Sequence, residues 1–194
     1  MKRPIPNFQA FTLKHRGFAR QLITEVEIFP AFDFSAPPSP LPGSVKTQAL
    51  WDTGATESVI TTATANSLAL KATGVSNVRH GGGMELHNTH LVNFGLPNRV
   101  GISGVLVTEN PHIINSFGAI IGMDIISRGD FTVTNFNGET CMTFRMPSMS
   151  SVDYVKEFND KLRSSVSRNE PCPCGQVDGN GKPIKFKKCH GASI

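Results

Sequence analysis

Apolar and polar residues alternate in short runs along most of the chain, and a period of two is typical of β-strands. The run Glu25-Val26-Glu27-Ile28 is a clear case, because its apolar residues fall on one face and its glutamates on the other. Thirteen prolines and eighteen glycines supply turns between such runs. The pattern predicts an all-β fold, with further strands at 46–51, 75–79, 85–94, 100–108, 119–121, 131–135 and 140–144.

The pattern changes after Pro147. Apolar residues at helical spacing predict a helix that Ser150 or Ser151 caps, with a stripe formed by Val152, Val155, Phe158 and Leu162. The segment that follows is rich in glycine, lysine and cysteine and is too short for an apolar core. We therefore expect a polar N-terminal arm (1–19), a β-domain (20–148), a helix with a linker (149–168) and a small tail (169–194).

One acidic residue, Asp52, stands in the otherwise uncharged stretch Ala49-Leu50-Trp51-Asp52-Thr53-Gly54-Ala55-Thr56. A predicted strand leads into it, Gly54 permits a tight turn, and β-type residues resume at Ser58. The carboxylate therefore lies on a loop at a strand end, where functional groups are common. Taken alone, such an aspartate is more often a turn residue that caps backbone N–H groups. We expect Trp51 in the core beside this loop.

Two later segments change that interpretation. A run of three glycines followed by Met84 predicts the tip of a hairpin, and Ile120-Ile121-Gly122-Met123-Asp124-Ile125 predicts a buried strand that turns into a helix at its glycine. Together with Asp52-Thr53-Gly54-Ala55, and in this order, they make residues 20–146 resemble a retropepsin-like aspartic protease, a single-lobed acid-protease β-barrel. The resemblance implies that Asp52 is catalytic, that Thr53 and Gly54 position it, and that a peptide substrate contacts the loop and a hairpin flap through Ala55, Thr56, Gly81, Gly82, Gly83 and Met84.

Proteases of this class use two carboxylates about 3 Å apart that share one proton, so that one activates water and the other protonates the scissile carbonyl. The chain contains one Asp-Thr-Gly sequence. The resemblance places Asp124 behind the active loop, in a structural role, and Asp130 lacks the following glycine and is expected in a turn. The second carboxylate is therefore expected from a second copy of the chain, in a homodimer with twofold symmetry.

Three cysteines and one histidine of the tail, Cys172, Cys174, Cys189 and His190, fall within nineteen residues. This set suits a tetrahedral zinc ion, which would supply most of the folding free energy of so short a segment. Pro-Cys-Pro-Cys-Gly and Lys-Lys-Cys-His-Gly resemble the SEC-C motif at the end of the bacterial preprotein translocase ATPase. The resemblance implies docking to a protein partner or to the ribosome. The alternative is a disordered basic tail with incidental cysteines.

A second metal site from His87 and His90 is disfavoured, because a spacing of three along a strand puts the two rings on opposite faces. The net charge of +4 comes largely from the tail, whose Lys182, Lys185, Lys187 and Lys188 suit an acidic partner. No aromatic pattern of an RNA-binding module accompanies these lysines, so a nucleic-acid-binding zinc protein is a minor hypothesis.

No apolar run approaches the ~18 residues of a membrane span, and the cysteines have metal spacing rather than that of a disulfide framework. We therefore expect a cytoplasmic protein that does not enter membranes. The main rival to the protease is a non-catalytic dimeric scaffold that recruits partners through the zinc motif. An intact Asp-Thr-Gly disfavours the scaffold, which has no need of two buried, repelling carboxylates.

Overall fold

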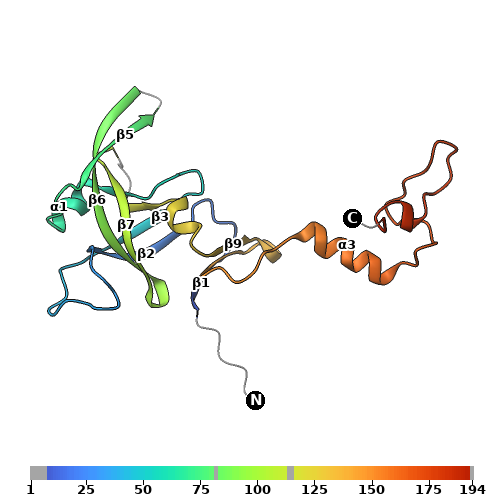
Figure 1. Ribbon diagram of the computed structural model, residues 1–194, viewed down its shortest axis with the longest axis horizontal. Coiled ribbons are helices and arrows are strands. Elements are labelled where there is room, and N and C mark those ends of the chain that lie inside the picture. The colour runs from blue at the N-terminus through green and yellow to red at the C-terminus, as the bar shows by residue number, and fades with distance from the viewer. Residues whose placement is uncertain (1–7, 81–82, 113–115, 193–194) are drawn as a thin grey trace, which may run out of the picture. The chain divides into compact units, whose positions relative to one another are not determined.

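The computed structural model describes residues 8–80, 83–112 and 116–192. The chain divides into two compact units, Met1–Met149 and Ser150–Ile194. Strands make up most of the first unit, and the second contains helix α3, Tyr154–Ser165 (Figure 1). Within the described ranges no helix is both long enough and apolar enough to cross a bilayer.

Six strands of the first unit close into a barrel in the order β2, β3, β8, β4, β7 and β6, because the long strand β6 pairs with β7 along one edge and with β2 along the other. The first half of β6 also pairs with β5, which extends the sheet as a hairpin arm (Figure 1). The predicted all-β fold is thus confirmed. The strands are β2 (Ile23–Pro30), β3 (Val45–Trp51), β4 (Val59–Thr61), β5 (Gly74–His80), β6 (Gly83–Leu96), β7 (Val100–Asn110) and β8 (Phe117–Ile121).

A separate antiparallel sheet has the order β1-β10-β9 and consists of β1 (Gln9–His15), β9 (Asp130–Thr134) and β10 (Thr140–Met146). The predicted hairpin turn is confirmed, since Asn137 and Gly138 have φ values of 53° and 77° between β9 and β10. The predicted polar arm over 1–19 is wrong for residues 9–15. There β1 pairs with β10 along its whole length and buries Phe11, so the segment is part of the packed sheet.

An aromatic cluster ties this sheet to the barrel. Trp51, at the end of β3, is only 5% exposed and is a core residue, as predicted. Its ring stacks on Phe131 of β9 with centroids 5.5 Å apart and planes 4° from parallel. Phe11 and Phe144 pack against the same indole from β1 and β10. The cluster therefore fixes the end of β3, and Asp52 is the next residue along the chain.

The helices are short: α1 (Thr62–Ser67), α2 (Met123–Ile126), α3, and the 3-10 turns η1 (Pro97–Arg99), η2 (Phe136–Gly138) and η3 (Phe186–Lys188). The predicted serine cap of α3 is wrong, because the helix begins at Tyr154 and the Asp153 carboxylate accepts a hydrogen bond from the backbone N–H of Lys156 at 2.9 Å. Val155 and Phe158 of the predicted apolar stripe are exposed.

Candidate active site and metal centre

Two strand ends hold Asp52. Strands β3 and β8 run parallel and end side by side, with Trp51 paired to Ile121. The backbone N–H of Asp52 donates to the carbonyl of Ile121 at 2.9 Å, so the strand ladder continues into the loop. Asp52 itself is half-buried. These strand hydrogen bonds fix the main chain at Asp52, where the loop begins.

The Asp52 side chain makes a tight turn with its own loop. Its Oδ1 atom accepts a hydrogen bond from the backbone N–H of Gly54 at 2.8 Å, and a Cβ atom on Gly54 would lie 3.1 Å from that oxygen. This is the turn cap expected of an ordinary loop aspartate. The other oxygen, Oδ2, accepts no hydrogen bond within the described ranges. The hydrogen bond to Oδ1 thus orients the carboxylate, and Oδ2 remains available for a hydrogen bond to another group.

The Gly-Met-Asp segment holds the loop from behind. The backbone N–H of Met123 donates to the carbonyl of Ala55 at 2.8 Å, and that of Asp124 donates to the carbonyl of Thr56 at 3.3 Å. The loop comes so close to Gly122 that a Cβ atom there would lie 2.6 Å from the Glu57 carbonyl. Only glycine fits at this contact, because no real Cβ approaches a carbonyl so closely.

A buried serine completes this support. Ser58 is fully buried, and its hydroxyl donates to Asp124 Oδ1 at 2.7 Å while it accepts from the backbone N–H of Gly122 at 3.0 Å. The same Asp124 oxygen accepts from the N–H of Ile125 at 2.9 Å. Asp124 therefore acts as a structural residue, the role expected for it. Ser58 has no counterpart among the predicted site residues, since its partner lies 66 residues further along the chain.

The site residues predicted on the loop differ in their exposure to solvent. Thr53, Gly54 and Thr56 are exposed and Ala55 is half-buried. In the hairpin arm, β5 and β6 pair up to His80 and Gly83, and Met84 is 61% exposed. The other predicted flap residues, Gly81 and Gly82, lie outside the described residues. Contact of any of these residues with a substrate stays a prediction.

Asp130 is not the simple turn residue expected. It begins β9, and its carboxylate forms an ion pair with Arg145 of β10. A hydrogen bond from the Ser148 hydroxyl, assisted by the backbone N–H of Met149 and by Arg145, holds the pKa of the Asp130 carboxyl well below its usual range. This carboxylate therefore has its own partners, away from Asp52.

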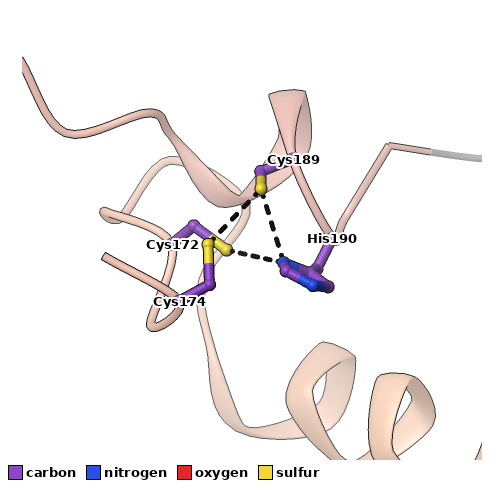
Figure 2. A group of neighbouring side chains, drawn as sticks. All are labelled: Cys172, Cys174, Cys189 and His190. Carbon is purple, nitrogen blue, oxygen red and sulfur yellow. Dashed lines mark hydrogen bonds between the residues drawn. The ribbon is translucent and has the colours of Figure 1, made fainter. Parts of the chain in front are cut away.

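The tail brings its four predicted metal-binding residues together. Figure 2 shows the three sulfur atoms and the imidazole turned toward one another, and their ligand atoms all lie within 4.8 Å. His190 Nδ1 lies 3.2 Å from Cys172 Sγ and 3.4 Å from Cys189 Sγ, which in turn lies 3.6 Å from Cys174 Sγ. Three thiols and an imidazole at such separations can hold a metal ion in a tetrahedron.

The backbone around the cluster is short but well connected. The N–H of Cys172 donates to Ile184 at 2.8 Å, and the N–H of Phe186 donates to Glu170 at 2.7 Å. Phe186 is 1% exposed, and a Cβ on Gly191 would lie 2.7 Å from its ring. A single buried ring is a small core, so metal binding would contribute much of the stability of this fold.

Two thiols of the cluster, Cys172 and Cys189, ionise differently. Burial opposes ionisation of Cys172, but hydrogen bonds from the backbone of Cys174 and His190 outweigh it and lower the pKa of the thiol to about 6. Burial and the neighbouring thiols raise the pKa of Cys189 to about 11. A metal ion that takes both thiolates must therefore displace a proton from Cys189 at neutral pH.

The β-unit and the tail of the chain are similar to different known proteins. No family model matches it. The solved structures that it resembles include retropepsin-like aspartic proteases. One, from Rickettsia conorii, is 12% identical, with 74% of this chain and 98% of that chain covered and a TM-score of 0.44. The EIAV protease with an inhibitor is 24% identical (56% and 86% covered, TM-score 0.40), and the retroviral protease-like domain of Ddi1 from Leishmania major is 18% identical (57% and 79%, 0.34).

The tail is similar to a different protein. Over 46 residues the chain is 48% identical to the protein translocase subunit SecA of Solidesulfovibrio magneticus. The match covers 24% of this chain and spans only 5% of the length of that SecA. It covers the tail, where the Cys3His cluster lies, and so the two resemblances found in the residues each have a counterpart among known proteins.

Proposed function

We propose that this chain is an aspartic endopeptidase of the retropepsin type, with Asp52 as its catalytic carboxylate. The support of the Asp52 loop is the observation that carries the proposal. A turn needs only the hydrogen bond from Gly54 to Asp52. This loop has in addition a buried serine that hydrogen-bonds both Asp124 and the N–H of Gly122, and a glycine that no larger residue can replace.

Asp33 provides a comparison within the same chain. Its Oδ1 also accepts a hydrogen bond from the backbone N–H two residues later, at 2.8 Å from Ser35 N. That turn is exposed throughout, and its carboxylate also accepts the Ser35 hydroxyl. Two aspartates thus cap similar turns, and only Asp52 is held by strand ends and a buried network. Rigid placement of one carboxylate is what acid–base catalysis requires.

The second carboxylate comes from the Asp52 loop of another copy, in a homodimer with twofold symmetry. The exposure of Thr53 and Gly54 supports this arrangement, because it leaves them accessible to the loop of a second copy, and the Oδ2 oxygen of each Asp52 would then face its mate. Two carboxylates at about 3 Å share a single proton. The unprotonated one takes a proton from the attacking water, and the protonated one donates to the oxygen of the scissile carbonyl.

The tail binds one structural zinc ion through Cys172, Cys174, Cys189 and His190. The donor set supports this assignment, since thiolate and imidazole together favour zinc in a tetrahedral site. Lys182, Lys185 and Lys188 are exposed around it. The loaded tail then docks on an acidic protein or ribosomal surface and brings the protease to its substrate.

The experiment compares Asp52→Asn with the matched control Asp33→Asn on casein and on a peptide library. Both changes remove one loop carboxylate of the same turn type and preserve the side-chain shape. We expect Asp52→Asn to lose at least about 100-fold in cleavage rate, the usual contribution of a general acid or base. Asp33→Asn should cleave as the wild type does.

Sedimentation of each form measures the dimer separately from catalysis. We expect wild type and Asp52→Asn both to be dimers. Equal cleavage by the two would disprove the catalytic role. A wild type that is dimeric yet inert on every peptide would favour the scaffold, in which the β-domain only joins two zinc tails.

A further inference from the structure

A second group of metal-binding side chains lies on the barrel, on the outer part of β6 and just beyond β7. Glu85 and His87 come from β6, and His112 follows the end of β7, where its backbone N–H donates to the Asn110 side chain at 2.8 Å. Glu85 Oε2 lies 3.3 Å from His87 Nε2 and 3.1 Å from His112 Nε2. One carboxylate oxygen is therefore flanked by two imidazole nitrogens.

The protonation of His87 follows from its other nitrogen. His87 Nδ1 lies 2.9 Å from the backbone carbonyl of Glu109. A carbonyl only accepts hydrogen bonds, so Nδ1 carries the proton and Nε2 presents a lone pair in the neutral ring. An Nδ1–H bonded to a backbone carbonyl is the arrangement that usually orients a metal-binding histidine.

The Nε2 atom of His87 has no partner suited to that lone pair. The His87 side chain is only 5% exposed, and its Nε2 atom is buried and makes no hydrogen bond. The Glu85 oxygen at 3.3 Å is itself an acceptor. Two acceptors that face each other at this distance repel unless a cation, either a second proton on the ring or a metal ion, lies between them, and an unsatisfied buried nitrogen is costly.

We propose that Glu85, His87 and His112 form a second metal site, which takes a divalent transition-metal ion such as Zn²⁺ or Ni²⁺. Two imidazoles and one carboxylate are ligands that such ions accept. In a tetrahedral site with bonds near 2.1 Å the ligand atoms lie about 3.4 Å apart, and the two Glu85 distances are close to that value.

The site is less converged than the tail cluster, which is the only fully converged group within the described ranges. The rings of His87 and His112 have centroids 6.3 Å apart. His112 is 64% exposed and Glu85 44% exposed, so both can turn toward a metal while His87 stays in place. Metal binding would then fasten the β5–β6 hairpin arm to the end of β7.

His90 belongs to a different set of contacts. Its Nε2 lies 2.9 Å from the Glu109 carboxylate and its Nδ1 lies 3.2 Å from the carbonyl of Lys71. Both nitrogens of His90 thus have hydrogen-bond partners, whereas in His87 only Nδ1 has one. This agrees with the expectation that His87 and His90 do not form a site together, and it makes His90 a suitable control.

The test uses the full chain with its tail already loaded with one equivalent of Zn²⁺, titrated calorimetrically with Ni²⁺. We expect one further equivalent per chain. Glu85→Gln and His112→Ala change exposed side chains and should preserve folding, and each should weaken this second binding event at least tenfold. His87→Gln should do the same, whereas His90→Gln removes an equally buried imidazole of the same strand and should leave binding intact.

Trp51 emission confirms that each variant is folded before titration, because this tryptophan is buried in the β-unit. The proposal would be overturned if the wild type bound no second equivalent. In that case a proton on His87, and not a metal ion, would lie between His87 and Glu85. A second equivalent that survives Glu85→Gln and His112→Ala, or one that His90→Gln abolishes equally, would also overturn it.

Discussion

Replacement of Ser58 by alanine tests the support behind the Asp52 loop. The change removes one fully buried hydroxyl that serves Asp124 and the N–H of Gly122. Leaving the buried N–H of Gly122 without a hydrogen-bond partner costs about 1–3 kcal/mol. The loss of the Ser58 bond to the Asp124 carboxylate adds about 1 kcal/mol, because Asp124 keeps its bond from the N–H of Ile125. We expect the free energy of unfolding to fall by about 2–4 kcal/mol.

The chain contains a matched control. The Ser35 hydroxyl donates to Asp33 Oδ1 at the same 2.7 Å that separates Ser58 from Asp124, but both of these residues are exposed. Water replaces an exposed hydroxyl, so Ser35→Ala should leave stability unchanged. Both variants delete a Ser–Asp hydrogen bond of the same length, but only Ser58→Ala does so in a buried site and also leaves the N–H of Gly122 without its partner.

Urea unfolding followed by Trp51 emission is the assay. Trp51 is the only tryptophan and reports on the β-unit without interference from the tail. With a slope of about 1–3 kcal/mol per molar urea, a loss of about 3 kcal/mol lowers the midpoint by about 1–3 M. A midpoint shift in Ser58→Ala no larger than that in Ser35→Ala would refute the reasoning, as would strict additivity of Ser58→Ala with Asp124→Asn.

The remaining predictions concern pH and metal. The hydrogen bond from Ser148, the largest of several causes, lowers the pKa of Asp130 in the folded state below the unfolded value of 3.8. The ionised carboxylate therefore stabilises the fold above pH 3.8, and this stabilisation is lost as the pH falls below that value. Because the folded-state pKa lies well below 3.8, the urea midpoint should drop as pH falls from about 4 to about 2 in the wild type and drop less in Asp130→Asn; equal drops over this range would contradict this. A metal chelator should remove amide-exchange protection at Phe186 and leave Trp51 emission unchanged, whereas unfolding of both units together would argue against a metal-dependent tail.

Much of the fold follows from local pattern. The alternation around Val26 and Ile28 predicts β2, and both residues are buried at 1% and 0% exposure. Asn137-Gly138 predicts the β9–β10 turn because both residues adopt positive φ, which few other pairs tolerate. The sequence also predicts the helical turn after Gly122, because a glycine can break a buried strand, whereas its close contact with Glu57 is visible only in the structure.

What could not be predicted depends on partners far along the chain. Gln9–His15 alternates only weakly, and its pairing with β10 involves residues more than 120 positions away. Ser58 looks like any polar residue before a strand until Asp124 is placed beside it. The cap of α3 was misassigned because Ser150, Ser151 and Asp153 are all good capping residues, and only the backbone geometry selects the aspartate.

The strand order has a consequence for how the protein is made. Strands β3 and β4 lie on either side of the Asp52 loop, yet they do not pair with each other. Each pairs with β8, a parallel partner for β3 and an antiparallel one for β4. Because a chain emerges from the ribosome in order, β8 follows the loop by more than sixty residues. Until β8 and the segment after it arrive, the loop lacks the hydrogen bonds that join Asp52 to Ile121, Ala55 to Met123 and Thr56 to Asp124, so the Asp52 loop can take its final form only after most of the barrel has been made.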